Sequence, residues 1–318
     1  NFFLIISCAA GEINSQRGKL CRFCKITDEN AKIIVYNGSI RSQGAKPLKQ
    51  TSLRGKKFFL LDMDGTIYLG DRLFDGTADF LEYVRASGGK YLFLTNNSSR
   101  SVDAYIDRMA RFGISTTKED FLTSVDALCV YLSKNGYGGK RLYAFGTASF
   151  RRQLTDAGFS VTDRLEDGID ALVCGFDTEL TFRKLEDACI LLDRGADFIA
   201  ANPDWVCPTS YGYVPDCGSV CEMLFRATGR RPVFIGKPQP EMALLAMEKY
   251  GYRPEETVVI GDRLYTDIAC GIHAGIDAAL VLSGEGTLAD VENSPEKPTH
   301  IYRNIRAILN DLTGEELK

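Results

Sequence analysis

The chain has 318 residues, of which 45% are hydrophobic and 25% are charged, so it can bury one large core or two moderate ones. The longest apolar run near its start lies within residues 2–10, far short of the roughly 20 residues that a membrane span requires, so no membrane partner is expected. Residues 1–57 carry 11 Lys and Arg against 3 Asp and Glu, whereas the remainder carries 27 against 39. This acidic body argues against nucleic acid as the main partner.

Residues 1–55 form a basic leader that we expect to be poorly ordered and to lie outside the fold. Its charge would permit only nonspecific contact with polyanions. Cys21 and Cys24 have the spacing of half a zinc site, but no second Cys or His pair lies nearby, so no zinc is expected. The ten Cys of the chain occur in apolar stretches typical of buried thiols in a reducing compartment, which predicts a cytoplasmic location.

From Lys57 onward, short apolar runs alternate with amphipathic stretches, a pattern typical of an α/β fold with a parallel sheet. The runs are continuously apolar, as strands covered on both faces require. Phe80, Leu81 and Val84 recur at helical spacing, and Pro240 marks the expected start of another helix. The predicted buried strands are 58–61, 91–94, 198–201, 257–260 and 278–282, with a closing strand at 300–302 and a helix over 305–312.

A second complete alternation of strands and helices falls within residues 126–204. Strands are expected over 141–145 and 171–175, and a helix over 181–194. We interpret this segment as an inserted α/β domain. The predicted organisation is therefore a core of residues 56–125 and 205–318, interrupted by an insertion of residues 126–204.

Polar residues follow three of the predicted core strands: Asp62 after the first, Thr95 after the second and Asp262 after the fourth buried run. In open parallel sheets, ligands bind outside the carboxyl ends of the strands. We therefore expect these three segments to converge on one crevice.

Asp62 and Asp64 are two carboxylates that end an apolar strand and precede Gly65, which permits a sharp turn. Two such acids can face one site and divide the work, one ionised for attack or metal binding and one protonated for proton donation. Alone, the same residues also suit a strand-end turn, in which Asp is common.

Three further segments suit an anionic ligand. The run that contains Thr95 and Asn96 offers hydroxyl, amide and backbone N–H donors, although it could equally cap a helix. Lys237 precedes a helix start, where its ammonium could neutralise a phosphoryl group, although a loop Lys is usually a surface residue. Asp262 and Asp267 place two carboxylates in a loop, which suits a hard cation.

Together these segments resemble the haloacid dehalogenase superfamily, whose pattern is DxDGT, a hydroxylic residue, a Lys and GDxxxTD. The runs LDMDGTIYLG, LTNNSSR, NPD, GKP and GDRLYTDIACGIHAG are similar to its class IIA branch, which includes p-nitrophenyl phosphatase-like and N-acetylglucosamine-operon phosphatase-like proteins. The resemblance covers about residues 57–312. It implies a Rossmannoid core with an inserted α/β cap domain.

The resemblance also implies a phosphatase mechanism. Asp62 would attack phosphorus, and Asp64 would protonate the leaving oxygen and then activate water. Thr95, Asn96 and Lys237 would hold the phosphoryl oxygens. The substrate would be a small phosphomonoester such as a sugar phosphate, a nucleotide, phosphoglycolate or p-nitrophenyl phosphate.

The implied cofactor is Mg²⁺. Its ligands would be the Asp62 carboxylate, the Asp64 backbone carbonyl and Asp262, with Asp267 supporting through water or by orienting Lys237. In the cap, Asp177, Thr178 and Tyr211 are candidates for contact with the leaving group, and members of this class often dimerise through the cap, so a homodimer is possible. His273 and His300 are interpreted as structural residues.

Three alternatives are open to the sequence. A dehalogenase of the same superfamily would lack Asp64 and need no metal. A regulator that is phosphorylated on an Asp would be shorter, would have no cap and would have no acid at the position of Asp64. A phosphometabolite-binding protein without turnover would not need Asp62, Asp64, Lys237 and Asp262 intact. The phosphatase is therefore the preferred interpretation.

Overall fold

The computed structural model describes residues 52–209 and 211–315 of the chain. The predictions for residues 1–51, including those for Cys21 and Cys24, lie outside the described residues. The predicted leader is too long at its C-terminal end, because the fold already includes Leu53. Leu53 is fully buried in the core, and its backbone N–H donates to Asp311 Oδ2 at 2.8 Å. Within the described part of the chain, no helix is long and apolar enough to cross a membrane.

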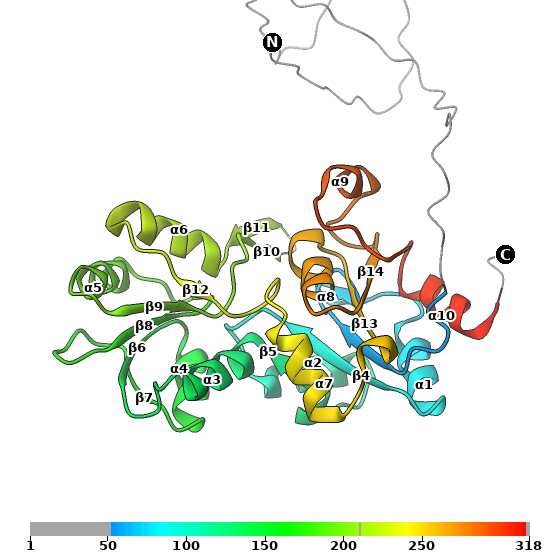
Figure 1. Ribbon diagram of the computed structural model, residues 1–318, viewed down its shortest axis with the longest axis horizontal. Coiled ribbons are helices and arrows are strands. Elements are labelled where there is room, and N and C mark those ends of the chain that lie inside the picture. Colours follow the sequence, from blue (N-terminus) through cyan, green and yellow to red (C-terminus); the bar gives the residue numbers. More distant parts are fainter. Residues whose placement is uncertain (1–51, 210, 316–318) are drawn as a thin grey trace, which may run out of the picture. The chain divides into compact units, whose positions relative to one another are not determined.

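A six-stranded parallel sheet forms the core, which confirms the predicted α/β class (Figure 1). Its central strand β1 pairs with β13 on one side and β4 on the other. The boundaries of the predicted strands hold to within one residue. The edge strand β5 was not predicted, because its three residues are too few for a recognisable pattern. In spatial order the strands are β15 (His300–Tyr302), β14 (Asp277–Val281), β13 (Thr257–Gly261), β1 (Phe58–Leu61), β4 (Lys90–Thr95) and β5 (Phe121–Thr123).

Successive residues of β1 face opposite sides of the core sheet. Phe58 and Leu60 pack into one apolar cluster, and Phe59 and Leu61 pack into another. Helices cover both faces, as is required for a sheet with apolar side chains on both faces. The first face is covered by α3 (Ser124–Lys134), α7 (Glu241–Tyr250) and α8 (Ala269–His273), and the second by α1 (Thr77–Ala86), α2 (Val102–Arg111) and α10 (Ile305–Thr313), while α9 (Leu288–Asn293) follows β14.

A five-stranded parallel sheet forms the inserted domain, which we call the cap. Its side chains alternate as they do in the core: Phe145 and Cys174 face α5 and α6, whereas Ala144 and Val173 join the cluster that continues into the core. In spatial order the strands are β12 (Val233–Phe234), β9 (Asp197–Ala200), β8 (Ala171–Cys174), β6 (Arg141–Phe145) and β7 (Ser160–Thr162). The helices are α4 (Ala148–Asp156), α5 (Phe182–Asp193) and α6 (Cys217–Thr228).

The predicted return to the core at residue 205 is wrong, because the cap sheet continues to Phe234. β12 pairs in parallel with β9, and α6 packs beside α5. The sequence did not reveal this because β12 has only two residues. In addition, the apolar stripe of α6 could cover either sheet equally well.

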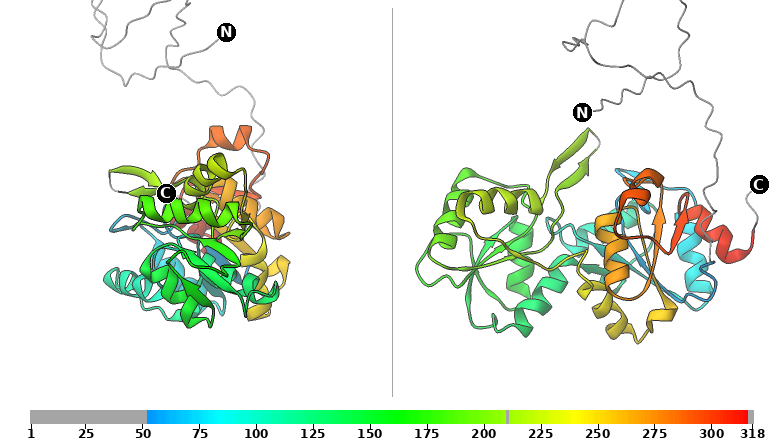
Figure 2. Two further views of the ribbon diagram at one scale, coloured as in Figure 1. Left: turned by 90° about the vertical axis from the view of Figure 1, so that its left-hand side faces the viewer. Right: turned by 45° about the horizontal axis from the view of Figure 1, so that its top comes forward.

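Two antiparallel hairpins lie outside the main sheets, and neither was predicted. One joins β2 (Tyr68–Leu69) to β3 (Arg72–Leu73) directly after the first acidic motif. The other joins β10 (Val206–Thr209) to β11 (Gly212–Pro215) and projects from the cap in yellow-green (Figure 2, right). Their strands are short and, apart from Tyr68, exposed or only partly buried, so they lack the apolar pattern that identifies a buried strand.

Candidate active site

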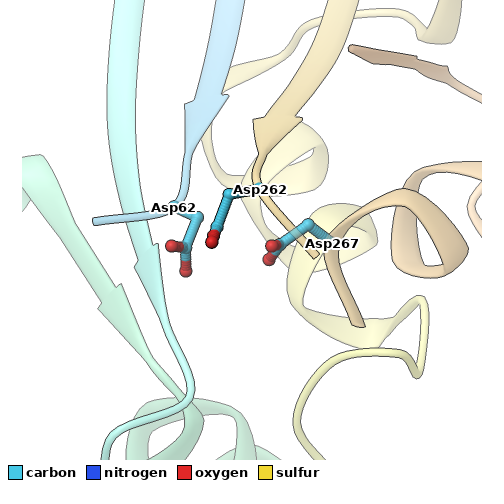
Figure 3. Close-up of side chains that lie close together, drawn as sticks. All are labelled: Asp62, Asp262 and Asp267. Atoms are coloured by element: carbon cyan, nitrogen blue, oxygen red, sulfur yellow. The ribbon is translucent and has the colours of Figure 1, made fainter. Parts of the chain in front are cut away.

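The polar ends of neighbouring core strands meet, as the sequence predicts. Asp62 follows β1 and Asp262 follows β13, so their carboxylates lie side by side, while Asp267 approaches from the segment after Asp262 (Figure 3). The backbone N–H of Asp62 donates to Ile260 O at 2.8 Å, which extends the β1–β13 pairing by one residue. Thr95 is the last residue of β4 and is buried on the other side of β1. The parallel sheet therefore assembles the site.

Lys237 is buried at the centre of this group, with only 1% of its surface exposed. Its Nζ donates to Asp62 Oδ1 at 2.6 Å, to Asp267 Oδ1 at 2.6 Å and to Leu94 O at 3.1 Å. Burial alone would lower the pKa of Lys237, but the charges of Asp267 and Asp62 outweigh burial and raise it. The lysine is therefore held as a cation between two carboxylates.

The three aspartates form a cluster suited to a divalent cation. Ligand oxygens of Asp62, Asp262 and Asp267 all lie within 4.8 Å of one another. Asp262 Oδ2 accepts the backbone N–H of Glu285 at 2.7 Å, but its Oδ1 is buried with no hydrogen-bond partner among the described residues. Burial raises the pKa of Asp62 well above its ordinary value and that of Asp262 to about 7. A bound cation would satisfy the unpartnered oxygen and favour the ionised form of these acids.

Glycines make room for the Asp262 carboxylate. A Cβ on Gly284 would overlap Asp262 Oδ2, and one on Gly65 would approach the same carboxylate closely. Gly65 also has a φ of 91°, a conformation that side-chain-bearing residues rarely adopt. The sequence therefore requires Gly at both positions for the first and last acidic motifs to meet.

Asp64 lies beside the cluster in a separate environment. Tyr68 Oη donates to Asp64 Oδ2 at 3.3 Å. Burial raises the pKa of Asp64, and the positive charges of Arg108 and Arg100 partly oppose that rise. Burial raises the pKa of both Asp62 and Asp64, but their neighbours differ, because Asp62 is held by the Lys237 ammonium and Asp64 by the Tyr68 hydroxyl.

Asn96 lines the pocket as predicted, and its carboxamide is engaged within the protein. Its Nδ2 donates to Asp204 Oδ2 at 2.6 Å and to Lys237 O at 2.8 Å, and its Oδ1 accepts the Lys237 backbone N–H at 2.9 Å. Because these contacts occupy the carboxamide, Asn96 positions Lys237 rather than offering its side chain to a phosphate. Thr95 Oγ1 accepts the Asn97 N–H at 3.2 Å and lines the pocket with Asp62.

The sequence analysis assigned no role to a polar network that joins the core and the cap. Arg263 Nη1 lies 2.9 Å from Asp204 Oδ1, and Arg263 Nε lies 2.9 Å from a Glu285 oxygen. Asn202 Nδ2 donates to Asp204 Oδ2 at 2.9 Å and to Asp216 Oδ1 at 3.0 Å. The NPD and GDR runs contain three of these residues, but nothing in a single sequence indicates that they are partners.

The cluster opens into a pocket whose walls come from both domains. Asp62, Asp64 and Thr95 line it from the core, and Cys207 and Pro208 of the β10–β11 hairpin line it from the cap. A larger cleft between core and cap adjoins this pocket and shares Asp64 with it. The hairpin therefore stands where the leaving group of a substrate would lie.

The predicted cap residues separate into two kinds. Asp177 has a fully buried side chain, and its Oδ2 pairs with Lys184 Nζ at 2.7 Å while its Oδ1 accepts the Glu179 N–H at 2.8 Å. Both oxygens are thus used within the cap, which argues against the predicted contact with the leaving group. Thr178 and Tyr211 line the cleft, and Tyr211 is 81% exposed.

The two histidines lie away from the residues that line this pocket. His273 ends α8, with its Nδ1 2.9 Å from Pro238 O and its Nε2 3.3 Å from Glu296. His300 begins β15 and is buried, with its Nε2 3.5 Å from Asp277. Both positions agree with the predicted structural roles.

Family models match both halves of the core. Residues 59–160 match a model described as haloacid dehalogenase-like hydrolase, and residues 234–308 match one described as HAD-hydrolase-like. An acid sugar phosphatase of Staphylococcus aureus is 32% identical over 256 residues, which is 80% of this chain and 98% of that protein.

Solved structures agree with the family models. A 4-nitrophenylphosphatase from Thermotoga maritima is 35% identical, with a TM-score of 0.77 over 82% of this chain and 98% of that one. A glycerol phosphate phosphatase from Mycobacterium tuberculosis, solved in complex with magnesium, is 31% identical, with a TM-score of 0.76 over 81% of this chain and 78% of that one. The chain therefore belongs to the haloacid dehalogenase superfamily of hydrolases, in its class IIA branch.

Proposed function

We propose that this phosphomonoester hydrolase acts through a phosphoaspartate on Asp62, with Mg²⁺ as its cofactor. The observation that carries the proposal is the position of Lys237 between Asp62 and Asp267, beside the unpartnered Oδ1 of Asp262. Fixed positive charge and a cation-binding cluster around one carboxylate provide what phosphoryl transfer requires, namely positioning and charge neutralisation.

In the first step, a carboxylate oxygen of Asp62 attacks the substrate phosphorus. Asp62 Oδ1 is held by Lys237, whereas no described residue donates a hydrogen bond to Oδ2, which is therefore the available nucleophile. The new bond joins Asp62 to phosphorus while the bond from phosphorus to the ester oxygen breaks. Asp64 donates its proton to the departing alcohol, in agreement with the burial that favours its protonated form.

In the second step, the Asp64 carboxylate takes a proton from water, and the water oxygen attacks phosphorus. The bond between phosphorus and Asp62 then breaks, which releases phosphate and restores both carboxyl groups. Lys237, together with the Thr95 hydroxyl, would hold the phosphoryl oxygens during both steps. Asn96 acts indirectly, because its carboxamide fixes the Lys237 backbone.

Asp62 and Asp262 would hold the Mg²⁺ through their carboxylates, and Asp64 through its backbone carbonyl. The all-oxygen donor set and the unpartnered Asp262 Oδ1 fit this ion. When bound, Mg²⁺ would neutralise charge on the phosphoryl group. Asp267 would play a supporting part, because its Oδ1 is engaged by Lys237.

The first test is hydrolysis of p-nitrophenyl phosphate with and without Mg²⁺, comparing the parent chain with Asp62→Asn. We expect magnesium-dependent turnover that falls at least about 10³-fold in the variant, since an amide cannot replace the nucleophile. Asp107→Asn is a matched control, because Asp107 is an exposed acid of α2 with no ion pair among the described residues. It should retain parental turnover.

The same assay separates the alternatives. A phosphoryl label that persists on Asp62 without release of phosphate would favour a phosphorylated regulator. Substrate binding without turnover by the parent chain would favour a binding protein. Either result would contradict the proposed hydrolysis.

We also propose that the chain acts in the cytoplasm and forms a homodimer through its cap. All the cysteines in the described ranges are free thiols, as a reducing compartment favours. Phe182 and Met223 of the cap are exposed apolar side chains of the kind that interfaces bury. Cell fractionation and analytical ultracentrifugation test the two points, and an extracellular or a strictly monomeric protein would refute them.

A further inference from the structure

The cleft that adjoins the catalytic pocket carries positive charge that the proposed mechanism does not use. Arg100 and Arg108 line it together with Asp64, the proposed acid for the leaving group. The charge therefore lies on the side of the phosphoryl site from which the alcohol would depart.

Arg100 is the freer of the two cations. It is exposed, it lies just before α2, and its guanidinium has no ion-pair or hydrogen-bond partner among the described residues. Its backbone is nevertheless fixed, because its carbonyl accepts a hydrogen bond from Gln153 Nε2 of the cap at 3.3 Å. An anchored backbone with an unpaired guanidinium can bind an anion without first breaking an internal ion pair.

Arg108 is a fixed cation in the last turn of α2. Its guanidinium carbon lies 4.2 Å from the centre of the Tyr68 ring, and its Nη2 donates to Gly70 O. Its one ion pair among the described residues is with Asp71, 4.0 Å away, whose side chain is 99% exposed. Such a solvated acid offsets little of the charge.

No acid of the cap compensates this charge within the described lining of the cleft. Asp177 is the cap carboxylate among the lining residues, and Lys184 already neutralises it. The remaining cap residues that line the cleft include Phe176, Leu180 and Val214. The cleft thus has a core side lined by Arg100 and Arg108 with Asp64 and Asp71, and a largely apolar cap side.

We propose that Arg100, supported by the field of Arg108, binds a second anionic group carried by the alcohol part of the substrate. This rests on the proposed function and refines it. The preferred substrates would be phosphomonoesters whose leaving alcohol bears a carboxylate or another phosphate, rather than neutral sugar or glycerol phosphates. Arg100 is then a specificity-determining residue, because its guanidinium can pair with a carboxylate through two hydrogen bonds.

The test compares two substrates of nearly equal size. 2-Phosphoglycolate has a carboxylate on its leaving alcohol, and 2-hydroxyethyl phosphate has a neutral hydroxymethyl group in its place. We expect the parent chain to show a kcat/KM for phosphoglycolate at least about tenfold higher, the scale of one charge-assisted hydrogen bond. In Arg100→Gln this preference should fall to near unity, and Arg100→Lys should restore part of it.

Arg111→Gln is the matched control, because it removes the same charge at the opposite end of α2. Arg111 is exposed and is absent from the lining of the cleft. A change of the substrate preference in Arg111→Gln equal to that in Arg100→Gln would overturn the proposal, since bulk charge would then explain it. A parent chain that prefers the neutral ester, or an Arg100→Gln variant that keeps the full preference, would also overturn it.

Failure of the proposed preference for anionic esters can be distinguished from failure of the proposed phosphatase function. Turnover of p-nitrophenyl phosphate by the parent chain, abolished in Asp62→Asn, would leave the phosphatase intact even if the preference for the anionic ester were absent. Arg108 variants are not used, because its contacts with Tyr68 and Gly70 also hold the segment after the first acidic motif.

Discussion

The catalytic cluster of the core and the leaving-group cleft of the cap face one substrate but are built differently. Lys237 and Asp267 are almost completely buried. Lys237 donates to Asp62 and Asp267, and Asp267 also accepts the Arg263 backbone N–H. Along the cleft, Tyr211 is mostly exposed and the Arg100 guanidinium has no ion-pair or hydrogen-bond partner among the described residues. The chemistry is thus fixed by a rigid sheet edge, whereas recognition is left to exposed side chains.

This difference predicts how each region responds to change. A substitution in the cluster leaves a buried charge or oxygen without its partner, which costs both folding free energy and activity. A substitution in the cleft alters few internal contacts and should change which ester is preferred. The following variants would test that contrast.

Lys237→Met should have the largest effect. It leaves Asp62 and Asp267 buried without their common cation, so we expect the free energy of unfolding to fall by about 3–5 kcal/mol. We expect kcat to fall by about 10³-fold, because the ammonium that faces the phosphoryl group is lost. Urea unfolding and p-nitrophenyl phosphate hydrolysis measure the two effects. Parental activity would show that the lysine is not part of the catalytic machinery.

Gly284→Ala should affect the metal site without removing any ligand. The added Cβ overlaps Asp262 Oδ2, so the carboxylate must move, and a shift of about 1 Å can cost on the order of 10–100-fold in kcat. The concentration of Mg²⁺ needed for half-maximal activity should rise. Gly139→Ala, in open space, is the control and should behave like the parent. Equal behaviour of the two variants would mean that Asp262 does not bind the cation.

Asp216→Asn should change the pH dependence of stability at the boundary of the two regions. Burial and the nearby Asp204 raise the pKa of Asp216 to about 7, while its hydrogen bonds and Arg263 oppose the rise. The folded state therefore binds a proton more tightly than the unfolded chain, and wild-type stability is lost as pH rises from about 4 to 7.

The variant lacks this titration. Its stability relative to the parent should increase by on the order of 2–4 kcal/mol over the same pH window and then stay level. Urea unfolding in EDTA at pH 4, 5.5, 7 and 8 measures the difference. A difference that stays constant with pH would show that Asp216 titrates in the ordinary range.

Tyr211→Ala should have the smallest effect and should be confined to recognition. The side chain is exposed at the hairpin, so the free energy of unfolding should change by less than about 0.5 kcal/mol. We expect KM to rise roughly two- to fivefold for esters with aromatic leaving groups, with kcat retained, because a stacking contact is lost. A large fall in kcat would show that the hairpin takes part in the chemistry.

The core of the site could be predicted because each part depends on a strand end. A parallel sheet brings the carboxyl ends of β1, β4 and β13 together, independently of the conformation of the loops. Asp62, Thr95 and Asp262 therefore converge. The resemblance to a known family supplied the roles. The structure agrees with that arrangement and adds the lysine geometry.

Long-range pairing could not be predicted. Asn96 was expected to hold a phosphoryl oxygen, and no pattern indicated that its side chain would contact Lys237 and Asp204, which are more than 100 residues away in sequence. The two-residue strand β12 and the exposed β10–β11 hairpin carry no periodic signal. The residue type and position of Asp177 were compatible with substrate binding. Only its ion pair with Lys184 shows that its carboxylate is used within the cap.

The short distance along the chain from β12 to Lys237 has a consequence for cap exchange. The edge strand of the cap ends at Phe234, and the catalytic lysine follows only three residues later. A chimera that exchanges caps at the apparent domain junction near residue 204 would cut the cap sheet between β9 and β12 and displace Lys237. A graft that preserves the register from Val233 to Lys237 could import a new specificity on an unaltered catalytic core.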